Sequence, residues 1–138
     1  MEKEKKQLNK IAKKYSLKLL LLFGSQVNKK NLHQESDFDI AYLTKRELNG
    51  KEQIDLNCDL MDIFHSDRID MVNLENVNPL LRYEIAINSR LLYGNELDYL
   101  EFKALAFRTH IDSQRLFDLE DILVKKRHKL LEQSIYGQ

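Results

Sequence analysis

The chain has 138 residues, the usual size of one domain, and 43% of them are apolar, which is enough to fill one hydrophobic core. Its 22 Lys and Arg residues balance 22 Asp and Glu residues, so no overall charge attracts nucleic acid or an anionic membrane. The mean hydropathy is −0.51, and no apolar run is long enough to cross a bilayer. We therefore expect a cytoplasmic protein without a membrane partner or a direct nucleic-acid partner. The single cysteine, Cys58, excludes an internal disulfide framework.

The first half of the chain predicts one helix and two buried strands. Residues 2–15 carry apolar side chains at helical spacing among many charges, which predicts an amphipathic helix. The run Leu17 to Phe23 is almost continuously apolar, as expected of a strand buried on both faces, and Gly24 ends it. After a polar stretch, Asp37 to Leu43 resembles a second buried strand, except that two carboxylates stand at its start.

The second half predicts further helices and strands in alternation. The expected elements are a helix within 46–64 with Cys58 in its core face, a strand over 69–74, a helix from Pro79 to about Asn88, and a short edge strand over 90–93. Nothing breaks a helix from Glu96 to Leu131, so this segment is predicted to be one long helix or two.

This order of elements predicts an α/β fold. It has a small mixed sheet of about four strands with flanking helices, followed by a C-terminal helical tail. We expect the domain to cover residues 1–95 and the extension to cover residues 96–138. The apolar side chains of the extension pack either on the domain's own sheet or on a partner protein, and both options remain open.

Two carboxylates at the start of the second strand indicate a functional site. Because side chains alternate along a strand, Asp37 and Asp39 emerge on the same side. Two anions so close repel each other and raise each other's pKa, so a cation is expected between them. Mg²⁺ prefers one or two carboxylates together with water and phosphate oxygens, which favours a nucleoside triphosphate as the second ligand.

Three more residues join this pattern in chain order. Gly24 lets a backbone or a phosphate approach where a Cβ would clash, and Ser25 offers a hydroxyl and an N–H group. Asp70 stands inside the third apolar strand. If that strand neighbours the second, Asp70 joins the other carboxylates, either as the base for an attacking hydroxyl or as part of a second metal site. An Asp-x-Asp pair alone is weak evidence, but this ordered set is much harder to obtain by chance.

The same residues resemble a known signature. Gly-Ser in LLLFGSQ, Asp-x-Asp in SDFDIAYL and the later Asp in RIDMVNL are similar to the nucleotidyltransferase signature of the DNA polymerase beta superfamily. Together with the small size and the segment LLRYEIAINSRLLYG, they resemble the minimal nucleotidyltransferase (MNT) antitoxins, which pair with HEPN-domain RNase toxins.

The resemblance implies a nucleotidyltransferase fold and assigns roles to the five residues. It implies that Asp37, Asp39 and Asp70 hold Mg²⁺ and form the catalytic set, with Asp70 as the base, and that Gly24 and Ser25 contact the triphosphate of ATP. The implied reaction transfers AMP from ATP to a tyrosine hydroxyl of the partner HEPN toxin, which silences the toxin.

The sequence departs from the family pattern in one loop. Eleven residues, rather than the usual ten, separate Ser25 from Asp37, and the small residue, Arg and Gly that often follow Gly-Ser are missing. Two alternatives stay open. A non-catalytic antitoxin would neutralise its partner by contact alone, which the longer loop favours and the three aspartates disfavour. A small-molecule nucleotidyltransferase, of the aminoglycoside type, would generally need an additional helical domain.

Overall fold

The computed structural model describes residues 2–24, 27 and 37–136 of the chain. Its elements follow one another as α1 (Glu2–Lys14), β1 (Leu17–Phe23), β2 (Phe38–Thr44), α2 (Gly50–Phe64), β3 (Ile69–Asn73), α3 (Pro79–Ile87), β4 (Ser89–Gly94) and α4 (Glu96–Tyr136). The predicted α/β fold, with a C-terminal helical tail, is confirmed.

The four strands form one mixed sheet in the order β3-β2-β1-β4. Strand β1 is antiparallel to both β2 and β4, while β2 and β3 run parallel. Parallel neighbours require a crossover connection, and α2 provides it between β2 and β3. The strand predicted at 90–93 is β4, and it lies at an edge of the sheet as expected.

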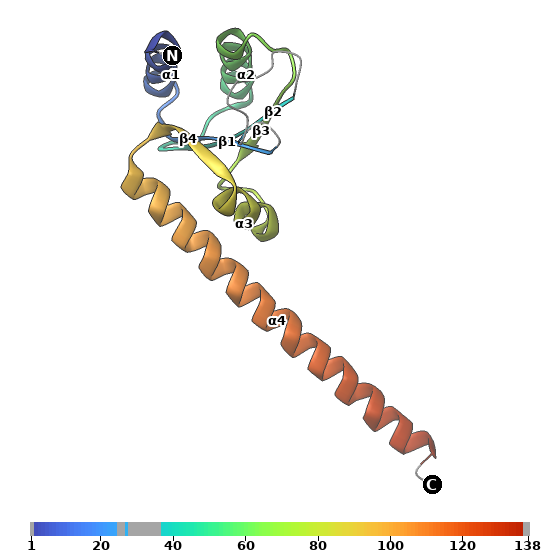
Figure 1. The fold of residues 1–138 in the computed structure, drawn as a ribbon. Coiled ribbons are helices and arrows are strands. Elements are labelled where there is room, and N and C mark those ends of the chain that lie inside the picture. Colours follow the sequence, from blue (N-terminus) through green and yellow to red (C-terminus); the bar gives the residue numbers. More distant parts are fainter. Residues whose placement is uncertain (1, 25–26, 28–36, 137–138) are drawn as a thin grey trace.

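Helices cover both faces of the sheet (Figure 1). Helices α1 and α2 lie on one face, where Leu20 and Leu22 of β1 pack with Leu56 and Leu60 of α2. Helix α3 and the start of α4 lie on the other face. The buried side chains of this second core are Leu19, Leu21, Ala41, Leu74, Ile85, Ala86, Phe102 and Ala106. The continuous apolar sequence of β1 thus supplies both cores, because alternate side chains enter opposite layers.

Local capping explains where the helices begin. The side chain of Asn49 accepts a hydrogen bond from the Glu52 N–H, and the Glu52 side chain accepts one from the Asn49 N–H. This capping box starts α2 at Gly50 rather than at residue 46. At the start of α3, the Asn78 side chain accepts a single hydrogen bond from the Leu81 N–H, and Pro79 lies in the first turn as predicted.

One prediction about α2 is wrong. Cys58 is exposed, because the buried side of the helix carries Leu56, Leu60, Ile63 and Phe64. Position 58 is two residues from both Leu56 and Leu60. Because successive residues of a helix are rotated by about 100°, it lies on the side opposite these two.

The segment after β4 forms one long helix rather than two. Its first turns pack on the sheet through Phe102 and Ala106, whereas every residue from 114 to 135 is exposed and the helix projects from the domain (Figure 1). No helix in the described part of the chain has the length and apolar content to cross a membrane.

Candidate active site

The sheet brings two of the predicted aspartates together. In the parallel pairing of β2 and β3, Asp39 is the register partner of Asp70, so the two side chains emerge on the same face of the sheet. The Phe38 N–H donates a hydrogen bond of 2.9 Å to the Arg68 carbonyl and fixes the start of this pairing. Strand order and register therefore satisfy the requirement that the third strand neighbour the second.

The two aspartates also interact electrostatically. Burial raises the pKa of the Asp39 carboxyl, and the negative charges of Asp70 and then Asp37 raise it further. Asp39 is half-buried, whereas Asp37 and Asp70 are exposed. The site thus concentrates negative charge around one partly desolvated carboxylate, and a bound cation would relieve this repulsion.

Gly24 lies directly against Asp39. Its backbone φ is +79°, and a Cβ placed on it would overlap Asp39 Oδ2 and lie 3.1 Å from Asp39 Cγ. Phe23, the residue before it, is in register with Asp39 across the β1–β2 pair. Glycine is required here both for the positive φ and for the close approach to the carboxylate. The turn after β1 and the carboxylates of β2 and β3 are therefore adjacent.

Of the other predicted site residues, the structure describes Asp37 but not Ser25. Asp37 directly precedes β2 and is exposed. Ser25 and nearly all of the following loop lie outside the described residues, so their contacts stay predictions.

Strand pairing adds residues that the sequence did not indicate. Asp70, Asp39, Phe23 and Ser89 are successive register partners across the four strands and form one row. Ser89 Oγ lies 2.6 Å from the hydroxyl of Tyr99, which also donates to the Ser89 carbonyl. The row therefore carries carboxylates on one side of Phe23 and a hydroxyl pair on the other. Only the pairing of β1 with β4 places this pair there, and the sequence holds no signal for that pairing.

The carboxylates of Asp39 and Asp70 suit Mg²⁺ better than a metal that takes all of its ligands from the protein. In residues 2–24, 27 and 37–136, no three Asp, Glu, His or Cys side chains lie close enough together to hold one metal ion. An ion at Asp39 and Asp70 would need further ligands from water or phosphate, which is the usual coordination of Mg²⁺ in phosphoryl-transfer enzymes. The raised pKa of Asp39 and the close approach of the Gly24 backbone to its carboxylate fit this arrangement.

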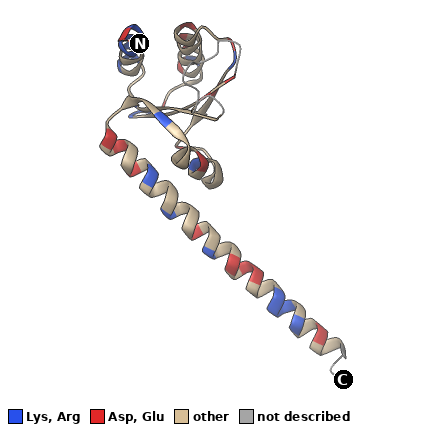
Figure 2. Cartoon of the chain, viewed as in Figure 1, with Lys and Arg blue, Asp and Glu red and all other residues tan. Residues whose placement is uncertain are grey.

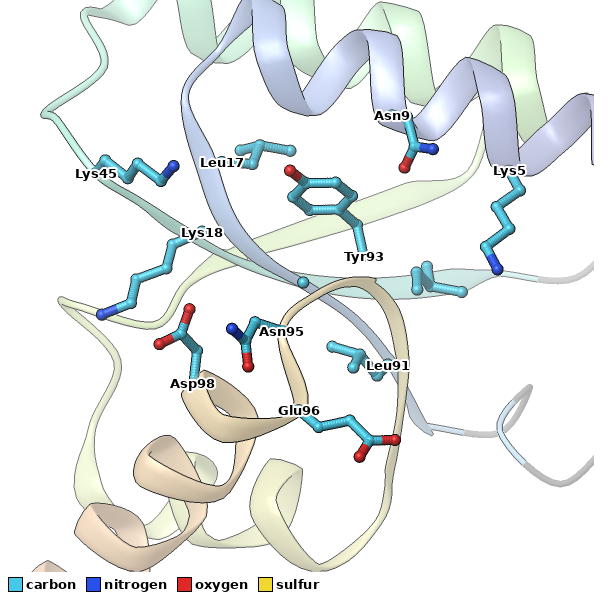
Figure 3. A pocket seen from close by; sticks show the side chains of 12 residues that line it. Lys5, Asn9, Leu17, Lys18, Lys45, Leu91, Tyr93, Asn95, Glu96 and Asp98 are labelled. Carbon is cyan, nitrogen blue, oxygen red and sulfur yellow. The ribbon is translucent and has the colours of Figure 1, made fainter.

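A hollow of about 630 Å³ lies elsewhere on the domain (Figure 3). It is lined by Lys5, Lys18 and Lys45 together with Glu96 and Asp98. Lys18 lies near the start of β1, whereas Asp39 pairs with Phe23 at its end, so the two places are about 17 Å apart at 3.4 Å per residue. Its mixed charges and its distance from the carboxylates separate it from the candidate active site.

Comparison with known proteins identifies the class. A mixed sheet that places carboxylates of two parallel strands beside a glycine turn is an arrangement suited to nucleotidyl transfer. Residues 6–98 match the family described as Polymerase beta, Nucleotidyltransferase. The chain is also 31% identical over 118 residues to Protein adenylyltransferase MntA of Aphanizomenon flos-aquae (strain 2012/KM1/D3), an alignment that covers 77% of this chain and 78% of that protein.

Two solved structures have the same fold. A toxin-antitoxin with AMP-PNP matches with a TM-score of 0.64 and 24% identity, over 86% of this chain and 98% of that one. The complex of a tri-AMPylated Shewanella oneidensis HEPN toxin with an MNT antitoxin contains a chain that matches with a TM-score of 0.61 and 22% identity. The match covers 88% of this chain and 98% of that one. The chain described here belongs to the polymerase beta nucleotidyltransferase family, which confirms the resemblance inferred from its motifs.

Proposed function

We propose that this chain is a protein adenylyltransferase and an antitoxin. It transfers AMP from ATP to a tyrosine hydroxyl of a partner HEPN-domain RNase toxin and thereby neutralises that toxin. The observation that carries the proposal is the register pair of Asp39 and Asp70 beside Gly24. The adenylyltransferase relative and the toxin-antitoxin structures, one with AMP-PNP and one with an AMPylated toxin, support it.

The reaction needs positioning more than covalent chemistry. The tyrosine oxygen attacks the α-phosphorus of ATP, a new P–O bond forms, and the bond from that phosphorus to the bridging oxygen breaks, so pyrophosphate leaves. The phenolic proton passes to a carboxylate, for which we propose Asp70, since it is exposed beside Asp39. In-line attack on a triphosphate held in place is the general requirement of such transfers.

We propose that Asp39 and Asp70 hold Mg²⁺ together with the triphosphate, and that Asp37 joins them once metal and nucleotide are bound, since the three carboxylates do not lie within reach of one ion in the structure. When bound, the metal neutralises charge on the phosphate oxygens and on the leaving pyrophosphate. Asp39 and Asp70 contribute from adjacent strands, and Asp37 contributes from the residue before β2. We propose that Gly24 and Ser25 contact the triphosphate, Ser25 through its hydroxyl and N–H groups.

Nucleotide labelling tests the activity. The chain and its co-expressed HEPN partner are incubated with Mg²⁺ and ATP labelled on either the α- or the γ-phosphate. We expect the α-label to appear on the partner and the γ-label to leave as pyrophosphate. Replacing the acceptor tyrosine of the partner by Phe should abolish the α-label. Label on the partner from γ-ATP instead would overturn adenylyl transfer in favour of kinase chemistry.

Matched variants separate catalysis from binding. Asp39→Asn removes a carboxylate from the site, whereas Asp62→Asn removes an exposed one on α2. We expect Asp39→Asn to lower the transfer rate by about 100-fold or more and Asp62→Asn to leave it unchanged. One alternative that the sequence leaves open is an antitoxin that acts by contact alone. Undiminished rescue of growth by Asp39→Asn, without labelling, would support that alternative.

A further inference from the structure

The distal half of α4 carries an apolar stripe that no other described part of the chain covers. Nine large apolar side chains of this half are 52% to 68% exposed; apart from Ile122, which lies on the opposite side, they are Leu116, Phe117, Leu119, Leu123, Val124, Leu130, Leu131 and Ile135. At about 100° per residue they share one side of the helix, and this side continues the one on which Phe102 and Ala106 pack against the sheet. A single helix of this kind, projecting from its domain, gains little stability without a partner.

Two charged residues lie within this stripe. Glu120 falls between the ridge of Leu116 and Leu123 and the ridge of Phe117 and Val124, and Arg127 falls one heptad further on the same line. Neither forms an ion pair within the part of the chain that the structure describes, whereas Asp121 and Lys125 pair at 3.0 Å just beside the stripe. Once this face is buried, a lone acid and a lone base on it would each need a partner of opposite charge.

A second copy of the chain supplies both partners at once. If two distal α4 helices pair in antiparallel orientation, with a two-fold axis between Leu123 and Val124, Glu120 of each copy faces Arg127 of the other. Figure 2 shows the matching pattern along the helix, an acidic block followed by a basic block. Of these blocks, Glu120 and Arg127 lie in the stripe, so the two-fold operation brings Glu120 of each helix against Arg127 of its partner, because such an interface uses the same patch twice.

The same register matches the shape of the surface. It sets Leu116 opposite Leu131 and Phe117 opposite Leu130 of the second copy. A hollow of about 440 Å³ lies there, between the start of α3 at Pro79 and Leu80 and the α4 residues from His110 to Glu120. Its lining is mainly apolar, so the last turns of the second copy's helix would cover it. Charge and shape thus indicate one register independently of each other.

We propose that this chain forms a homodimer through an antiparallel pairing of the distal α4 helices. The apolar stripe supplies the contact area, and the two Glu120–Arg127 pairs fix orientation and register, as a buried polar residue does in coiled coils. The dimer does not depend on the proposed enzymatic activity, so either can fail without the other.

Charge reversal tests the pairing in the full-length chain without any partner protein. Sedimentation velocity over a range of concentrations measures the self-association of each form. We expect Glu120→Arg alone and Arg127→Glu alone to weaken it by about tenfold or more, since each sets like charges against each other. The double variant Glu120→Arg/Arg127→Glu should restore it, and so should an equimolar mixture of the two single variants. Lys129→Glu, on the opposite side of the helix, should leave it unchanged.

Cysteine crosslinking tests the register. In a Cys58→Ser background, Val124→Cys lies at the two-fold axis and should give a disulfide-linked dimer, whereas Lys129→Cys should not. A chain that stays monomeric at every concentration would overturn the proposal. So would a dimer that survives both single reversals, or a stripe that is buried only when another protein is added.

Discussion

Asp39→Asn should stabilise the metal-free fold even though it removes a proposed catalytic group. Burial and the charges of Asp70 and Asp37 raise the pKa of Asp39, so the ionised carboxylate opposes folding. Neighbouring strands lie about 4.8 Å apart. Two charges about 5 Å apart repel by about 0.8 kcal/mol at the dielectric constant of water and by about 3 kcal/mol at an effective value of 20. Because Asp70 is exposed, we expect a gain near the lower end, about 1 kcal/mol.

The pH dependence has a definite sign. A carboxyl whose pKa is higher in the folded state than in the unfolded state binds more protons when folded, so stability falls as pH rises through that interval. The advantage of Asp39→Asn should therefore be complete at pH values above the raised pKa of Asp39. It should vanish below the ordinary pKa of an aspartate, where the wild-type carboxyl is neutral in both states.

Thermal unfolding in EDTA, repeated with Mg²⁺, measures the effect. A gain of about 1 kcal/mol corresponds to a rise in Tm of about 3 to 5 °C for a chain of this size. Mg²⁺ at ten times its Kd would stabilise the wild type by about 1.4 kcal/mol and the variant by much less. Asp62→Asn is the matched control and should change neither value. A lower Tm for Asp39→Asn in EDTA at neutral pH would refute the electrostatic reasoning.

Three further substitutions test the fold around the site. Gly24→Ala should lower the transfer rate by about tenfold or more and reduce the free energy of unfolding by about 1 kcal/mol or more. The reason is that φ is +79° and the new Cβ would overlap the Asp39 carboxylate. Wild-type kinetics would mean that the turn does not contact the site. Tyr15→Phe should lower the free energy of unfolding in urea by about 1 to 2 kcal/mol, because the Tyr15 hydroxyl donates a 2.6 Å hydrogen bond to Asp59; no change would show that solvent replaces this bond. Phe102→Ala should cost about 3 to 5 kcal/mol by the same measurement, since this side chain is 7% exposed in the second core; a loss below about 1 kcal/mol would mean that α4 does not depend on this anchor.

The strands could be predicted from the sequence because their patterns are local. The run Leu17–Phe23 is bounded by a turn and Gly24, and the structure begins and ends β1 at the same residues. Strand β3 ends within one residue of its expected boundary. The first residue of α2 is harder to predict from the sequence, because it depends on the reciprocal hydrogen bonds between Asn49 and Glu52.

The site was predictable in part. Alternation along a strand places Asp37 and Asp39 on one side, but only the parallel pairing of β2 with β3 sets Asp70 opposite Asp39. The Ser89 hydroxyl on the same row depends on the pairing of β1 with β4, which connects residues far apart in the chain. Cys58 was misplaced because helical spacing over a short segment did not resolve which side of α2 is buried.

Binding of Mn²⁺, used in place of Mg²⁺, with a non-hydrolysable ATP analogue tests most directly whether Asp39 and Asp70 hold one metal–triphosphate unit. Paramagnetic resonance gives the Kd of wild type, Asp39→Asn, Asp70→Asn and the double variant without any turnover. If both carboxylates serve the same ion, each single variant weakens binding by about tenfold or more, and the double variant loses far less than the sum of the two losses. Losses that simply add, or binding that neither substitution changes, would contradict the shared site.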